Sequence, residues 1–205
     1  LPIFNIRNNR KIRVGLAGNL NPNHFNNREF NARFAMPNRI EAFEAVKNNF
    51  EDQVVIAKKP SDFFPTSHVQ ILLGGEGYPQ FPDAAPRDYL RFLKQTDFFM
   101  ALPGSRFPHC HSLIEALSMG CIPILSYAHL MPIKLINNVN CLTYQNTQEL
   151  VSQIEYALSL SANEVKTMRK KAVAYYQKNL SKQFRTDLFN HKIYEVDRMY
   201  VVSSD

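Results

Sequence analysis

The sequence predicts an α/β protein in which helices cover both faces of a doubly wound, parallel sheet. Short apolar runs alternate with segments of helical periodicity through most of the 205 residues. The clearest example is a strand–loop–helix–strand unit over residues 96–126, which is typical of a right-handed parallel crossover. With 45% hydrophobic and 20% charged residues, the composition is that of a globular protein with a large core. We therefore expect residues 1–205 to form one domain that includes C-terminal helices at about 184–200.

The first half of the chain carries three of the predicted strands. Each is a short apolar run that suits a buried strand: Ile12–Leu16, Gln53–Ala57 and Val69–Leu73. After the first strand, Asn19–Pro37 is rich in asparagine and is predicted to be a long loop, a kind of segment that often carries function. Asn38 and Glu41 have the spacing of a capping box and open a predicted helix. The third strand runs into the turn-rich segment Gly74–Pro79, and Pro86 opens the next helix.

The central unit begins with a strand predicted over Phe98–Leu102, which a Pro-Gly pair terminates. A polar loop follows, and Ser112 opens a helix that Gly120 closes as a C-cap. A further strand, Cys121–Leu125, starts at once. In parallel sheets of this kind, ligands bind beyond the carboxyl ends of the strands, which is where the polar loop lies.

The last third of the chain is predicted to be mainly helical. A short helical piece at Ile133–Ile136 precedes the last strand, Cys141–Tyr144. Asn146 opens an amphipathic helix, and the capping box of Ser161 and Glu164 opens another. These elements continue the alternation of strands and helices seen in the rest of the chain.

Charge and cysteine content narrow the class of protein. A net charge of +6 fits a site for a phosphorylated small molecule, nucleic-acid binding or a basic solvated surface. Nucleic acid is not expected as a partner, because the basic residues are scattered and no recognition motif accompanies them. Three cysteines without a CxxC pair disfavour a disulfide framework and indicate a reducing compartment, so we expect a cytoplasmic location. No apolar run in the sequence is long enough to span a membrane.

Residues 104–115 concentrate the side chains with useful chemistry. The first turn of a helix leaves N–H groups free and has a positive dipole end, so it can seat a diphosphate. Arg106 can add a bidentate phosphate contact, and His109 and His111 can donate hydrogen bonds or transfer protons. The two histidines are therefore the candidate catalytic residues.

Glu115 has two interpretations at this level. It lies four residues after His111, so the two share a helix face, and a carboxylate there suits the two hydroxyl groups of a ribose. Ser112 and Glu115 also have the spacing of a capping box, in which the acid would only accept a hydrogen bond from the Ser112 N–H. The residues alone leave both roles open.

The sequence predicts no metal site. The triplet His109, Cys110 and His111 is not spaced like a known zinc site, and no Asp-x-Asp motif is present to hold Mg²⁺ at a diphosphate. A Gly-x-Ser-x-Gly elbow, a Walker A loop and an HExxH motif are absent as well. We therefore expect a metal-independent protein without a cofactor.

Three features of the central stretch occur together in a known family. Pro103 ends a strand, Glu115–Leu117 has the sequence Glu-Ala-Leu, and Gly120–Ile124 has the pattern Gly-x-Pro-hydrophobic. This order and spacing resemble the donor-binding, C-terminal domain of GT-B-fold glycosyltransferases, in the glycogen-synthase-like retaining group and the exostosin-like group. The run Leu72–Pro79 is similar to a Gly-x-Gly-Pro turn of that domain, and the resemblance extends over roughly Ile12–Leu158.

The resemblance implies a Rossmann-like fold, one half of a GT-B enzyme, with a nucleotide sugar as its substrate. Glu115 would bind the donor ribose. The backbone of His111, Ser112 and Leu113 would hold the diphosphate, and the loop at 107–109 would face the donor sugar.

Two positions depart from the family pattern. Gly18 and Asn19 fall where the family has a Gly-Arg pair, so phosphate neutralisation would come from Arg33, Arg106 or another basic residue. Phe107 stands where the retaining group has a second glutamate, which leaves retaining and inverting mechanisms both open.

The resemblance also implies that an acceptor-binding, N-terminal domain is missing from this chain, and that any peripheral association with a membrane would come through that missing part. The leading hypothesis is the nucleotide-sugar-binding domain of a glycosyltransferase that moves a sugar from a UDP- or GDP-type donor to a hydroxyl group. The alternatives are a nucleotide-sugar epimerase of the same architecture and a non-catalytic Rossmann-like binding domain.

Overall fold

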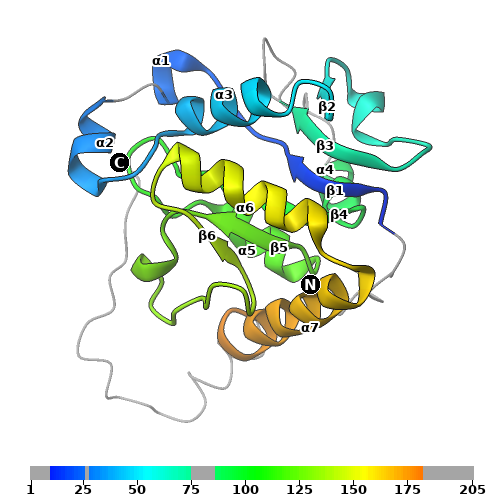
Figure 1. The fold of residues 1–205 in the computed structure, drawn as a ribbon. Coiled ribbons are helices and arrows are strands. Elements are labelled where there is room, and N and C mark those ends of the chain that lie inside the picture. The colour runs from blue at the N-terminus through cyan, green and yellow to red at the C-terminus, as the bar shows by residue number, and fades with distance from the viewer. Residues whose placement is uncertain (1–9, 26–27, 75–85, 182–205) are drawn as a thin grey trace.

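The computed structural model describes residues 10–25, 28–74 and 86–181, and it contains a six-stranded parallel sheet (Figure 1). The strands lie in the order β2-β3-β1-β4-β5-β6. Their bounds are β1 Ile12–Leu16, β2 Val54–Ala57, β3 Val69–Gly74, β4 Thr96–Met100, β5 Ile122–Leu125 and β6 Leu142–Thr143. The predicted doubly wound α/β fold is therefore confirmed, although β3 rather than β2 lies beside β1. This order exchanges the first two outer strands of the common dinucleotide-binding sheet.

Helices cover both faces of the sheet. Helices α3 and α6 pack on one face, and α4, α5 and α7 pack on the other. The neighbouring residues Phe98 and Phe99 of β4 contribute to these two separate cores, as alternation along a strand requires. Because both faces are covered, the strands are mainly apolar rather than alternating, and polar residues such as Arg13 and Asp97 lie near the amino ends of the strands. The helices are α1 Pro22–Phe25, α2 Arg28–Phe34, α3 Arg39–Asn49, α4 Pro86–Leu93, α5 His111–Ser118, α6 Thr147–Ser159 and α7 Ala162–Asn179.

Three helix starts and one helix end follow the local signals of the sequence. Capping boxes are formed at the start of α3 by Asn38 and at the start of α7 by Ser161. The Asn146 side chain accepts a hydrogen bond from the Glu149 N–H at the start of α6. Gly120 has a φ of +71° just after the last residue of α5, which is the left-handed position that favours glycine.

The prediction of a long loop over Asn19–Pro37 is wrong in part. The segment contains α1 and α2, and two of its apolar side chains, Phe30 and Met36, are buried in the core. The asparagine-rich composition hides this, because a few widely spaced apolar residues, Leu20 among them, attach the segment to the core. The result is a folded arm after β1 rather than an open loop.

The helical piece predicted at Ile133–Ile136 is also wrong. A 3₁₀ turn at Ala128–Leu130 comes earlier, and the Ile136 N–H donates to the Asn140 side chain, 2.7 Å away. An isolated bridge then joins Asn137 to Cys141. An asparagine side chain thus replaces the helical backbone acceptor. The predicted turn at Gly74–Pro79 beyond its first residue and the predicted helix at 184–200 lie outside the described residues.

A buried charge cluster closes the amino end of the sheet. Arg169 of α7 donates to Oδ1 of Asp97 in β4, and Arg13 of β1 lies 3.5 Å from Oδ2. Arg10 donates to the backbone oxygens of Met119 at 2.6 Å and Leu93 at 3.1 Å. Burial lowers the pKa of Arg169 to about 10, although the carboxylate of Asp97 opposes this. The cluster ties α7, β1 and β4 together at the edge opposite the one where a ligand would bind.

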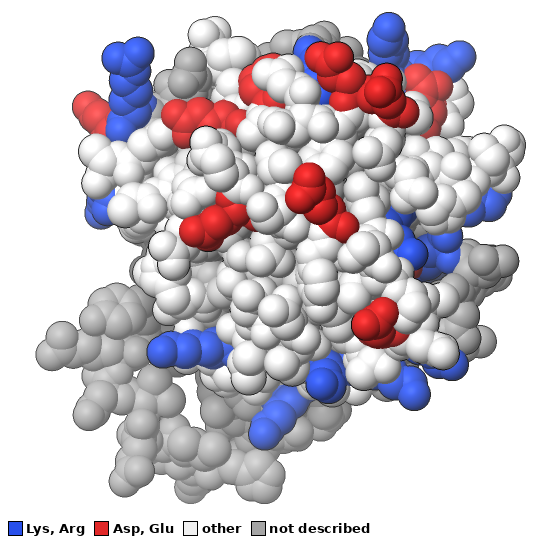
Figure 2. All heavy atoms as spheres, viewed as in Figure 1, with Lys and Arg blue, Asp and Glu red and all other residues white. Residues whose placement is uncertain are grey.

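The surface carries charges of both signs. On the face covered by α3 and α6, acidic side chains lie among neutral ones, and the basic side chains sit mainly toward the edges of the view (Figure 2). Within the described ranges, no helix combines the length and apolarity that a membrane crossing requires.

Candidate functional site

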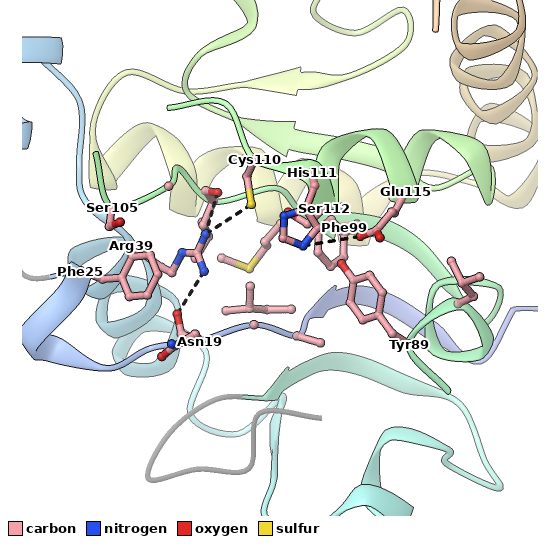
Figure 3. A pocket seen from close by; sticks show the side chains of 17 residues that line it. Asn19, Phe25, Arg39, Tyr89, Phe99, Ser105, Cys110, His111, Ser112 and Glu115 are labelled. Atoms are coloured by element: carbon pink, nitrogen blue, oxygen red, sulfur yellow. Dashed lines mark hydrogen bonds and ion pairs between the residues drawn. The ribbon is translucent and has the colours of Figure 1, made fainter. Parts of the chain in front are cut away.

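A cavity of about 560 Å³ opens at the carboxyl edge of the sheet between β1 and β4. The chain leaves β1 toward α3 on one face and leaves β4 toward α5 on the other face. The cavity therefore lies where the winding of the sheet reverses, which is the usual ligand site of such folds. Its size is within the roughly 300–1,000 Å³ typical of small-molecule sites. Figure 3 shows the lining residues, among them Gly18, Asn19, Phe25, Arg39, Tyr89, Phe99, Ser105, Cys110, His111, Ser112 and Glu115.

Arg39 provides the positive charge of this cavity. It is the first residue of α3 and only 8% exposed, and its guanidinium lines the cavity. Nε donates to the oxygen of Pro103 at 3.0 Å, Nη1 to Asn19 at 3.1 Å and Nη2 to Leu102 at 3.4 Å. The ring of Phe25 lies 4.2 Å from the guanidinium carbon. Arg39 thus joins the loop after β1 to the loop after β4 and is held in one position.

The hydrogen-bond acceptors that the described residues offer to the guanidinium of Arg39 are neutral. In the parts of the chain that the structure describes, no carboxylate forms an ion pair with this guanidinium. Its position at the amino end of α3 adds the positive end of a helix dipole, so the local potential is more positive still. A buried cation without a counter-ion is costly. We infer that this end of the cavity is built to receive an anion.

Helix α5 presents its amino end to the same cavity, through Cys110, His111 and Ser112. Of the two roles that the sequence left open for Glu115, the capping box with Ser112 does not form. Cys110 is the N-cap, and its side chain makes no capping bond. The N-cap therefore lies two residues before Ser112, and Glu115 falls beyond the N3 position that a capping box requires. The first N–H groups of any helix lack partners within the helix, so they are available to a ligand here.

Glu115 turns its carboxyl group toward the cavity instead of toward the backbone. Among the described residues, its buried Oε2 atom has no hydrogen-bond partner, and Nε2 of His111 lies 4.0 Å from it. Burial raises the pKa of Glu115, although His111 opposes this shift. In the absence of a ligand, the environment of Glu115 therefore disfavours the ionised form of its carboxyl group.

Replacement of Glu115 by glutamine is expected to stabilise the free protein slightly at neutral pH, because it removes a desolvated carboxylate. Because the pKa of Glu115 is raised, the folded protein binds a proton at this carboxyl group more tightly than the unfolded chain does. The stability contributed by protonation is therefore present at low pH and lost as the pH rises through the folded-state pKa. In chemical denaturation between pH 4 and 8, the free energy of unfolding of the Glu115→Gln variant should increase relative to that of the wild type as the pH rises. A lower stability of the variant across this range would contradict the assignment.

The structure places the other predicted site residues in two groups. Gly18 and Asn19 line the cavity beside Arg39, and His111 lies at its mouth with its ring largely exposed. Leu113 has its side chain in the core, and its backbone N–H donates to the Cys110 oxygen at 3.1 Å, so among these residues it offers the site least. These positions agree with a site around the amino end of α5.

The remaining three predicted residues do not line the cavity. His109 turns away, with Nε2 3.1 Å from the Leu130 oxygen and its ring against Tyr127. Arg33 lies 5.2 Å from the ring centre of Phe34 and 5.3 Å from that of Phe107. Arg106 is exposed in the loop after β4 and is not among the lining residues. His111 is therefore the only one of the two candidate catalytic histidines that lines this cavity.

Sequence reasoning missed Arg39 and Tyr89. The Asn38 capping box does identify Arg39 as the first helical residue, where a basic side chain opposes the dipole and therefore signals another role. Tyr89 belongs to the apolar stripe of α4, but its ring lines the cavity. Burial and the nearby charge of Glu115 raise the pKa of Tyr89.

No family model matches the chain, and no curated protein matches it either. The functional interpretation therefore depends on the geometry of the cavity and on the residue pattern of the central unit. Within the described ranges, no three His, Cys, Asp or Glu side chains lie close enough to hold a metal ion.

Proposed function

We propose that this chain is the nucleotide-sugar-binding domain of a glycosyltransferase, and that the cavity between β1 and β4 holds the nucleoside diphosphate part of the donor. The observation that carries the proposal is the buried guanidinium of Arg39, which among the described residues donates only to neutral acceptors and lies beside the open amino end of α5. Both groups favour an anion at the same place.

The two ends of the cavity differ in charge, and this difference orients the ligand. Arg39 and Glu115 lie on opposite sides, with His111 and Ser112 between them (Figure 3). A carboxylate repels phosphate but accepts hydrogen bonds from the two hydroxyl groups of a ribose. The proposal therefore places the diphosphate between Arg39 and α5, and the ribose at Glu115.

The same arrangement suits departure of the nucleoside diphosphate. Negative charge develops on the leaving diphosphate when the bond to the sugar breaks. The Arg39 fork and the first N–H groups of α5 are held in place beforehand, so they can stabilise this charge without rearranging. An acceptor-binding domain would supply the hydroxyl nucleophile and its base. The reaction needs no metal in this proposal.

The alternative of a non-catalytic binding domain assumed that Ser112 and Glu115 only cap the helix. Cys110 is the N-cap instead and Glu115 lines the cavity, so this alternative can no longer rest on a capping role, although a domain that binds a nucleotide without catalysis would use the same cavity. An epimerase of the same architecture would use the same diphosphate contacts and differs only in needing no sugar acceptor. Nucleotide binding tests the shared part of both enzymatic proposals.

The proposal is tested by measuring the free energy of unfolding with and without UDP, GDP or ADP. A nucleotide present at about one hundred times its Kd should add about 2.7 kcal/mol. Glu115→Gln should abolish most of this gain, whereas Glu155→Gln, which changes an exposed acid of α6, should leave it intact. If no nucleotide stabilises the protein, the proposal fails. If inorganic pyrophosphate stabilises both variants equally and the nucleoside adds nothing, the cavity is a simple anion site.

A further inference from the structure

The connection between β5 and β6 displays an apolar surface. Leu130, Ile133 and Ile136 are 38%, 46% and 56% exposed. Between them, Met131 and Leu135 are buried in the core and pin the connection to the domain. The three exposed side chains therefore project from a backbone that its buried neighbours anchor to the domain. We refer to Leu130, Ile133 and Ile136 as the β5–β6 patch.

The described chain ends close to this patch. The Tyr175 hydroxyl of α7 donates to the backbone oxygen of Ile133, so the second half of the helix lies against the connection (Figure 1). The last helical residue, Asn179, is about 6 Å further along the axis at 1.5 Å per residue. Leu180 still packs against the same core. The segment that follows therefore starts beside the β5–β6 patch.

That segment, residues 182–205, lies outside the described part of the structure, but its sequence is informative. Phe189, Ile193, Val196 and Tyr200 are spaced four, three and four residues apart, which places them on one face of a helix. Charged residues occupy intervening positions, among them Lys192. Residues 182–188 can span up to about 23 Å when extended, which is more than a return to the patch requires.

We propose that the apolar stripe of Phe189, Ile193, Val196 and Tyr200 docks on the β5–β6 patch of the same chain. Twelve helical residues are about 18 Å long, so the stripe can cover all three side chains of one short connection. The chain link keeps the two surfaces at a high effective concentration, so a modest contact suffices.

The size of the patch favours this occupant over a second copy of the chain. Stable interfaces between proteins bury about 800 Å² on each partner, with 20–30 residues a side. Three half-exposed aliphatic side chains are far fewer than such an interface uses. A tethered segment needs no such area, because it does not pay the cost of bringing two molecules together.

Amide hydrogen exchange on the full chain tests the docking. Ile193→Asp should speed exchange of the amides in 133–139 by about tenfold, while Arg198→Asp, at a position opposite the stripe, should change it less than twofold. Ile136→Asp should have the same effect, and the double variant should add little to either single one. Exchange of the β4 and β5 amides should stay slow in all variants, which shows that the domain remains folded.

Two results would overturn this proposal. One is unchanged exchange over 133–139 in both the Ile193→Asp and Ile136→Asp variants. The other is protection that grows with protein concentration together with a dimer in light scattering, because the occupant would then be a second copy. The nucleotide experiment is independent of both, since neither the stripe nor the patch lines the cavity between β1 and β4.

Discussion

Replacement of Asp97 by asparagine is expected to lower the free energy of unfolding by about 3–5 kcal/mol, the usual cost of removing one partner of a buried ion pair. Asp97 accepts from Arg169, whose side chain is almost fully buried, and lies near Arg13 and Arg10. Without the carboxylate, three guanidinium groups would lose the acid that faces them at this end of the sheet. Urea denaturation at neutral pH measures the loss.

Two further variants separate this effect from a general loss of charge. Asp52→Asn changes an exposed acid and should alter stability by less than about 0.5 kcal/mol. Burial raises the pKa of Asp97 despite the arginines, so the cost of desolvation is large in this pair. Asp97→Asn combined with Arg169→Met should therefore recover part of the stability, since removing both charges costs less than removing one. A double variant less stable than Asp97→Asn would refute this account.

Replacement of Arg39 by glutamine is expected to weaken binding of a nucleoside diphosphate by about 10- to 100-fold, the size of a lost charge-assisted hydrogen bond. Binding of the corresponding nucleoside should change little, because the proposed place of the ribose is on the other side of the cavity, at Glu115. Calorimetric titration of UDP or GDP and of the free nucleoside measures the two affinities.

Two further variants serve as controls for the predicted effect of Arg39→Gln on the affinity. Arg33→Gln removes a cation that stacks on Phe34 and Phe107 outside the cavity, so it should leave the affinity within about twofold. Arg39→Lys keeps the charge but loses the fork that reaches three backbone oxygens, and it should bind more tightly than the glutamine variant. Equal losses in the Arg33 and Arg39 variants would point to general surface charge instead.

The candidate site was partly predictable because some of its parts are local. An acid near the start of a helix that follows a parallel strand is visible in the sequence, and Glu115 does line the cavity. Arg33 and Arg106 were chosen for their nearness to the expected site along the chain. Arg39 occupies the cavity because its side chain reaches backbone oxygens that are 20 to 64 residues away along the chain. A pattern of neighbouring residues cannot show a contact between residues that are so far apart along the chain.

By itself, the sequence determined the order of the strands and larger helices, their parallel arrangement and the starts of α3, α6 and α7, because capping side chains and apolar periodicity act over three or four residues. Only the tertiary structure decided that β3 lies beside β1, that Glu115 turns toward the cavity instead of capping α5, and that Asp97 meets Arg169. Each of these three features depends on which of several possible partners a buried strand or side chain contacts in the folded domain. Packing and desolvation across the whole domain select the partner, so short sequence patterns do not reveal it.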